Sequence, residues 1–209
     1  MVRGLEQGQR AALLISECQL GVVAPAVSLF PALAEQVAQR AILPRIAELA
    51  EAFRAADLPV VHLHVAHRQG FSGLPRTSAI FARAIKAGAM LEGAQAVEAA
   101  AEVVPRPGDI VHRRAFSLVA FHGTELDQLL RNLGVQTLVL VGVSTNVAIS
   151  GCALCASDLG YQVVVSEDCI AGASPESHRF IVDNLLPLYS TLSDAQAVAQ
   201  AIVPRGPLR

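Results

Sequence analysis

The feature that most constrains the fold is a short apolar run that ends in a glycine and leads into a helix-like segment. The run Thr137-Leu-Val-Leu-Val141 is rich in β-branched residues and stops at Gly142. This composition is typical of a strand buried on both faces of a parallel sheet. Ser144, Thr145 and Asn146 follow, and each is able to cap a helix there. Such a turn is either an ordinary β–α connection or a site where free N–H groups hold an oxyanion or carboxylate.

The same alternation of strand-like and helix-like segments continues along the chain. Strands are expected at 11–15, 60–65, 110–112, 161–165 and 189–192, and helices at 33–56, 124–133, 175–186 and 194–202. Pro44 implies a kink or a break in the first of these helices. The pattern predicts an α/β fold, a doubly wound, mostly parallel sheet of about six strands with helices on both faces. We expect a single domain over residues 1–209.

Composition narrows the function classes. Hydrophobic residues make up 53% of the chain and charged residues 16%, which indicates a well-buried globular protein. A formal net charge of −2 without a Lys/Arg cluster argues against nucleic acid as a partner. No apolar run approaches the ~20 residues that span a bilayer, and the N-terminus lacks a secretion-signal pattern. We therefore expect a cytoplasmic protein whose partner is a small molecule.

The spacing of the four cysteines does not indicate a disulfide framework. They are Cys18, Cys152, Cys155 and Cys169. Cys152-x-x-Cys155 has the spacing of a redox or zinc pair, but no second pair accompanies it. Core packing on a helix is therefore the favoured interpretation of these two thiols.

The segment GVSTNVAISGCALCASDLGYQVVVSEDC, residues 142–169, resembles the signature region of the isochorismatase-like hydrolases. This family includes nicotinamidases and other cysteine amidohydrolases. The matching positions are Gly142, Val143, Thr145, Asn146, Gly160, Tyr161, Val163 and Asp168. A second motif, F-x-G-T-x-L, begins at Phe121, and the resemblance covers about residues 10 to 195. It implies an isochorismatase-like, Rossmann-like three-layer fold and a hydrolase.

The resemblance also implies a catalytic Asp–Lys–Cys triad, and all three positions differ here. They are occupied by Glu17, Arg113 and Ala148. Glu17 keeps the carboxylate, whereas an alanine methyl group cannot attack a carbonyl carbon. The arginine position is open to an alignment slip, because the family's Y-S-A-F reads F-S-L-V-A-F here and Arg114 is adjacent. An arginine stays protonated and suits carboxylate binding rather than proton transfer.

One branch of the family, the isochorismatases, works without a cysteine and cleaves a vinyl ether by acid catalysis. This branch motivates our first hypothesis, acid–base hydrolysis of a small, carboxylate-bearing substrate with no cofactor. Glu17 is then the acid and Arg113 binds the substrate carboxylate. Other substrate contacts are expected from Gln19, Val23, Phe116, Val143, Ser144, Thr145 and Asn146.

Several alternatives stay open. A catalytically silent relative would bind a small ligand or act as a subunit of an assembly, and an amidohydrolase would use Cys152 or Cys18 as its nucleophile. His64 and His67 lie near the metal-ligating cluster of nicotinamidases, but no matching aspartate is evident, so we predict no metal. The segment 68–93 is either a lid or an oligomer contact. By analogy with relatives we expect a homo-oligomer, a dimer or tetramer.

Overall fold

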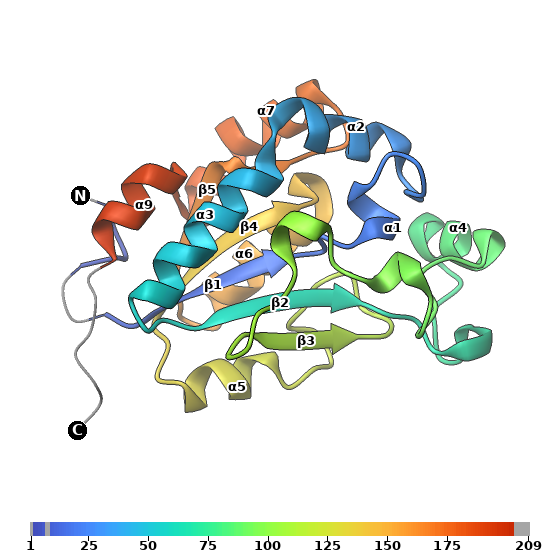
Figure 1. Ribbon diagram of the computed structural model, residues 1–209, viewed down its shortest axis with the longest axis horizontal. Helices are drawn as coiled ribbons and strands as arrows, with labels where there is room; N and C mark the ends of the chain where they lie inside the picture. Colours follow the sequence, from blue (N-terminus) through green and yellow to red (C-terminus); the bar gives the residue numbers. More distant parts are fainter. Residues whose placement is uncertain (1, 7–8, 203–209) are drawn as a thin grey trace.

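Six strands form one sheet in the computed structural model, which describes residues 2–6 and 9–202 (Figure 1). Neighbouring strands are all parallel, and their order is β3-β2-β1-β4-β5-β6. The strands are β1 (Ala11–Ser16), β2 (Val60–Val65), β3 (Ile110–Arg114), β4 (Thr137–Val143), β5 (Gln162–Ala171) and β6 (Thr191–Ser193). The predicted doubly wound parallel sheet is confirmed.

Strands β1 and β4 lie side by side at the centre, and every residue of both is buried. Burial on both faces explains their uninterrupted apolar sequences. The chain runs outward from β1 to β2 and β3, and then from β4 to β5 and β6 on the other side. The point where the winding direction reverses therefore lies between β1 and β4, where Ser16 pairs with Gly142. In such sheets ligands bind at the carboxyl ends of the strands beside this point.

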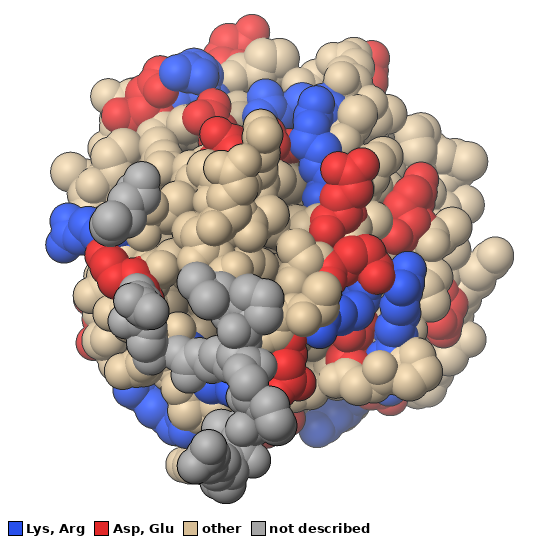
Figure 2. All heavy atoms as spheres, turned by 60° about the vertical axis from the view of Figure 1, so that its left-hand side comes forward, with Lys and Arg blue, Asp and Glu red and all other residues tan. Residues whose placement is uncertain are grey.

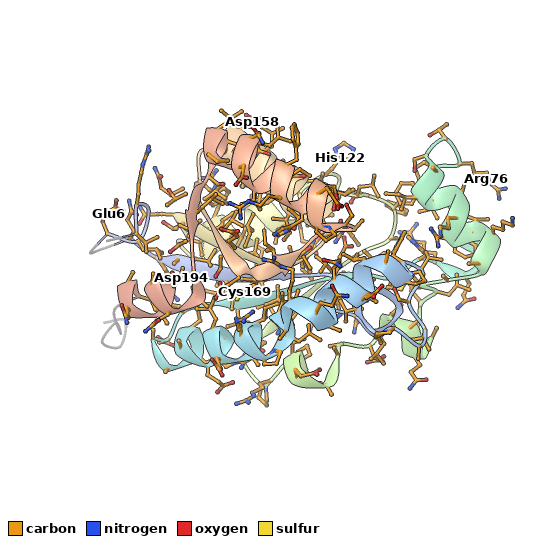
Figure 3. All side chains as sticks on the ribbon, turned by 90° about the horizontal axis from the view of Figure 1, so that it is seen from above. Glu6, Arg76, His122, Asp158, Cys169 and Asp194 are labelled. Carbon is orange, nitrogen blue, oxygen red and sulfur yellow. The ribbon has the colours of Figure 1, made fainter. Side chains whose placement is uncertain are left out.

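Helices cover both faces of the sheet, as Figure 3 shows from above. The first face carries α2 (Pro31–Arg40), α3 (Ile42–Ala55) and α9 (Ala195–Ala201). The second carries α5 (Leu126–Asn132), α6 (Ser150–Asp158), α7 (Pro175–Asn184) and α8 (Leu186–Tyr189). Each layer has its own apolar core against the sheet, so the sheet divides two hydrophobic clusters.

The helix expected at 33–56 is two helices. The break is at Ala41, which adopts a left-handed conformation (φ 48°, ψ 46°) between α2 and α3. Pro44 lies in the first turn of α3, where a missing backbone N–H leaves no helical hydrogen bond unmade. The prediction of a break near this proline is confirmed.

The strand expected at 161–165 continues to Ala171 in β5 because its pairing with β4 shifts register and resumes beyond the irregularity. Glu167 and Asp168 therefore lie within β5, beyond residue 165, where the strand was expected to end. Asp168 Oδ1 accepts hydrogen bonds from Ser166 Oγ and from the backbone N–H of Ala195, each at 2.9 Å. Asp168 thus ties α9 to the sheet.

The segment 68–93 contains helix α4 (Ala79–Ala87), which stands with the short α1 (Leu20–Val23) on the side toward which the strands point (Figure 1). Single helical turns at Gln69–Phe71, Gln95–Val97 and Ala101–Val103 complete the connections on this side. On the left-hand face of Figure 1, acidic and basic side chains are interspersed (Figure 2). In the described part of the chain, no helix has both the length and the apolar character to cross a membrane.

Candidate active site

Glu17 follows β1 directly, at the carboxyl end of the central strand. Its backbone is in the left-handed region (φ 51°), and its N–H donates to Leu63 O at 3.0 Å. Gly142 of β4 passes beside this turn, and a Cβ atom at that position would collide with the backbone oxygen of Ser16. A glycine at position 142 therefore lets β4 approach the end of β1 closely.

Arg114 is the arginine that pairs with Glu17. Its Nη2 donates to Glu17 Oε1, and its Nε donates to Ser117 O at 2.8 Å. The Arg114 side chain is only 2% exposed, and that of Glu17 is 18% exposed. Arg113 is exposed, because adjacent residues of a strand point to opposite faces. The arginine beside Glu17 is thus Arg114, the adjacent alternative, and not Arg113, which was assigned to the lysine position.

The turn after β4 brings the other half of the site to Glu17. The Val143–Ser144 peptide is cis, and a π-helical turn (η4, Thr145–Ile149) leads into α6. Asn146 Oδ1 accepts a hydrogen bond from Ala173 N at 2.8 Å, which leaves the NH₂ group of this amide to donate to other atoms. Ser144, expected as a possible helix cap, makes no side-chain capping hydrogen bond.

Glu17 and this turn face a cavity of about 510 Å³. The volume is in the range of small-molecule sites. The cavity is mostly apolar, and its walls come from the strand ends, the start of α2, and α4. The lining residues include Glu17, Phe30, Leu33, Ile80, Arg83, Leu118, Ser144, Asn146 and Ala148. The structure thus brings together four predicted site residues, namely Glu17, Ser144, Asn146 and Ala148.

Five other predicted contacts do not line this cavity. Gln19 is fully buried, and its Nε2 donates to Val65 O and Val97 O at 2.8 Å each, so it joins β2 to a neighbouring loop. Val23 lines a separate hollow, and Phe116 lies under the Arg68 guanidinium. Val143 is wholly buried, and Thr145 Oγ1 lies 2.9 Å from His178 Nδ1.

The candidate nucleophiles Cys152 and Cys18 are both buried and do not line the cavity. Burial raises the pKa of Cys152 to about 11 and also raises the pKa of Cys18. Both are therefore thiols near neutral pH, and a thiol is a weaker nucleophile than a thiolate. Cys152 Sγ accepts a hydrogen bond from Ala120 N at 3.4 Å.

The histidines considered as metal ligands lie in β2 and just after it. His67 Nδ1 lies 2.6 Å from Ala115 O, and burial, followed by nearby positive groups, lowers the pKa of His64 to about 4. Within residues 2–6 and 9–202, no three His, Cys, Asp or Glu side chains are arranged to hold a metal ion. His64 and His67 are thus not joined by a third ligand in that part of the chain.

The electrostatics of Glu17 combine two opposing effects. Burial disfavours the charged carboxylate and raises its pKa, while the charge of Arg114 and its hydrogen bond lower it. The net direction is upward from the ordinary value of 4.5. Glu17 consequently holds its proton to a higher pH than an exposed glutamate, as a general acid requires.

Several cavity-lining residues were not predicted from the sequence, and Arg83 and Ile80 are two of them. Both are on α4, in the segment for which no secondary structure was predicted. The signal was present, because Ser78 precedes Ala79–Ala87 and accepts from Phe81 N at 3.4 Å as an N-cap. The apolar spacing of Ile80, Phe81, Ala84 and Ile85 is also helical.

A carboxylate over an apolar cavity, at the reversal point of a parallel sheet, is the arrangement of an α/β enzyme for small molecules. The Isochorismatase domain family matches residues 11–197, so the chain belongs to the isochorismatase family, whose members are hydrolases. The predicted family is thereby confirmed.

Relatives agree with this assignment. The chain is 34% identical over 83 residues to the uncharacterized isochorismatase family protein YecD of Escherichia coli, over 40% of this chain and 44% of YecD. The match thus spans less than half of that relative. This chain is also 29% identical over 181 residues to the uncharacterized isochorismatase family protein YwoC of Bacillus subtilis, which covers 86% of this chain and 87% of YwoC. The crystal structure of a cysteine hydrolase from Pseudomonas syringae pv. phaseolicola shares the fold, with a TM-score of 0.83, 21% identity, and coverage of 97% of this chain and 96% of that one.

Proposed function

We propose that this protein hydrolyses a small molecule in the 510 Å³ cavity by acid–base chemistry, with Glu17 as the acid and without a cysteine nucleophile. The observation that carries the proposal is the pairing of Glu17 with Ala148 in one cavity. Glu17 is the one carboxylate among the described residues that line it. A methyl group replaces any nucleophile that a covalent route would need at position 148.

A vinyl ether is the substrate class best suited to these residues. Protonated Glu17 transfers its proton to the terminal carbon of the double bond, and the ether carbon becomes an oxocarbenium ion. Water adds to that carbon and returns a proton to the Glu17 carboxylate. The resulting hemiketal collapses to a carbonyl compound and an alcohol, so one water is consumed and no covalent enzyme intermediate forms.

Arg114 helps Glu17 to exchange its proton without itself giving one up. Its guanidinium keeps a positive charge throughout and is locked by the Ser117 carbonyl. The charge stabilises the Glu17 carboxylate after proton transfer, while burial favours the acid form before it. The two effects bring the two protonation states of Glu17 closer in free energy, which favours a group that must act as acid and then base.

A catalytically silent role is the second candidate, and the Glu17–Arg114 contact favours it. An ion pair already satisfies the Glu17 carboxylate, and the family's proton-transferring lysine is replaced by an arginine. In that case the cavity binds a ligand without turning it over. A homo-oligomeric assembly and a cytoplasmic location stay predictions, and size-exclusion chromatography with light scattering checks the first.

The test compares wild type with Glu17→Gln on vinyl ethers, nicotinamide, simple amides and ureas. We expect vinyl-ether turnover in wild type and a loss of about 10²–10⁴-fold in the variant, with unchanged circular dichroism. Cys152→Ala is the matched control and is expected to keep its turnover. Equal activity of wild type and Glu17→Gln would remove Glu17 from the mechanism, and loss in Cys152→Ala would favour the thiol route. Ligand binding without turnover would favour the silent role.

A further inference from the structure

We infer that Arg83 of α4 binds an anionic group of the substrate and thereby sets which end of the molecule reaches Glu17. The inference rests on the proposed function in one respect, namely that the 510 Å³ cavity is the substrate site. The ligand class it defines is a small molecule with an apolar body and a carboxylate or similar oxyanion at one end.

The distribution of charge in the cavity is the first observation. Among the described lining residues only Glu17 and Arg83 are ionisable, and Ser144 and Asn146 are the other polar ones. The remaining walls are apolar and come from α1, α2, α4 and the strand-end loops. The cavity therefore has one carboxyl group and one positive group, and apart from Ser144 and Asn146 the rest of its lining is apolar.

Arg83 is free to take an anion. In residues 2–6 and 9–202 no Asp or Glu lies within ion-pair distance of it. Its guanidinium carbon lies 5.4 Å from the centroid of the Phe30 ring, which also lines the cavity. Stacking on an aromatic face orients an arginine and leaves its N–H groups at the edge available. Phe30 thus holds the cation at the cavity wall.

Helix α4 fixes which of its side chains face the cavity. Phe81 and Ala84 are buried and anchor the helix, and Ser78 caps its first turn. Ile80 and Arg83, three residues apart, lie on one side of the helix and both line the cavity. Lys86 follows at the same spacing, is exposed and does not line the cavity, which makes it a matched control for charge on this helix.

The partner of Glu17 settles the direction in which a substrate binds. Arg114 is already engaged by Glu17 and by the Ser117 carbonyl, and it does not line the cavity. An anionic group at the Glu17 end would meet a carboxyl group without an available cation. The same group at Arg83 meets a positive charge, so the cleavable bond is directed to Glu17.

The test uses two probes of one shape, 3-phenylpropionate and 3-phenylpropanamide, with calorimetry on wild type, Arg83→Gln and Lys86→Gln. We expect wild type to bind the carboxylate about tenfold more tightly than the amide at low salt. Arg83→Gln removes this preference and leaves amide binding unchanged, whereas Lys86→Gln keeps it. Because Arg83 is exposed, the preference also falls at high ionic strength.

Three results would overturn the inference. They are a carboxylate preference that survives in Arg83→Gln, an equal loss in Lys86→Gln, and failure of both probes to bind. The binding readout is separate from the turnover test of Glu17. A preference lost in Arg83→Gln, together with no turnover of any substrate, supports the anion site and counts against acid–base hydrolysis. Turnover that depends on Glu17, with no role for Arg83 in binding, supports acid–base hydrolysis and counts against the anion site.

Discussion

Two arginine–carboxylate pairs lie against the same sheet, and they differ in how many donors the carboxylate has. Asp109, in the turn before β3, accepts from Arg54 Nε at 3.0 Å, Arg54 Nη2 at 2.6 Å and Arg106 N at 2.9 Å. His62 Nε2 lies 3.0 Å from its Oδ2. Glu17, at the other end of the strands, accepts from Arg114 Nη2 and from no other donor in the described residues.

The pKa values of the two carboxyl groups also move in opposite directions. Burial raises the pKa of each, and at Asp109 the hydrogen bonds from Arg54, Arg106 N–H and His62 outweigh burial and lower it. At Glu17 burial outweighs the single arginine. An arginine beside a buried carboxylate therefore does not by itself make a stable ion pair. The several hydrogen bonds to Asp109 hold that buried carboxyl group in its charged form, and the single donor to Glu17 does not.

The largest expected effect is on stability, in a comparison of Asp109→Asn with Glu17→Gln. Asp109→Asn removes the buried ionic partner of Arg54, which keeps only the half-exposed Glu51, and places an NH₂ group beside the Arg54 donors. We therefore expect a loss of about 3 kcal/mol in the free energy of unfolding. Glu17→Gln replaces a carboxyl group whose charged form is already disfavoured, so we expect a change within about 1 kcal/mol. Urea unfolding of both variants measures these changes.

For turnover we expect the opposite order, because Glu17→Gln removes the proposed acid and Asp109→Asn does not. Asp109 does not line the cavity and precedes β3, whereas Glu17 follows the carboxyl end of β1, so Asp109→Asn should retain turnover at temperatures where it is folded. Equal destabilisation by the two substitutions would contradict the distinction between a structural and a reactive pair.

A smaller effect is the pH dependence of stability. The folded-state pKa of Asp109 lies below 3.8, so its stabilising contribution is present above that pH and is lost as the pH falls through the folded value. The folded-state pKa of Glu17 lies above 4.5, so its contribution is complete below that pH and is lost as the pH rises through the folded value. Urea unfolding from pH 3 to pH 8 should therefore show Asp109→Asn approaching wild type at the acid end. The free energy of unfolding of Glu17→Gln should rise relative to that of wild type as the pH rises. The same pH response in both variants would contradict this account.

The parts of the site that follow central strands were predictable from sequence. The apolar runs of β1 and β4 identify two buried parallel strands, and the carboxyl ends of such strands lie at one edge. Glu17 and the turn with Ala148 follow those ends directly, so their meeting in one cavity was expected. The apolar pattern of the strands and the parallel topology are therefore sufficient to predict this part of the site.

The parts that depend on register or on tertiary packing were not predictable. Arg113 and Arg114 are adjacent, and a one-residue shift along a strand moves a side chain to the opposite face. Gln19 was expected at the substrate, but α1 begins at Leu20 and turns the Gln19 amide toward the backbone of β2. Arg83 lies on a helix whose own sequence indicates amphipathicity, and nothing local tells which side of the molecule that helix covers.

The smallest expected effect tests whether donor number sets the pKa of Asp109. Arg54→Lys keeps the charge but cannot make both guanidinium hydrogen bonds to Asp109. We therefore expect the free energy of unfolding to fall by about 1 kcal/mol and the pKa of Asp109 to shift upward. Arg106→Lys is the matched control, because Arg106 reaches Asp109 through its backbone N–H while its side chain contacts exposed Glu51. That variant should leave the Asp109 pKa in place. Carbon-detected NMR titration of the Asp109 carboxyl carbon measures both. An unchanged pKa in Arg54→Lys would mean that charge alone governs Asp109, and the contrast with Glu17 would then need a cause other than donor number.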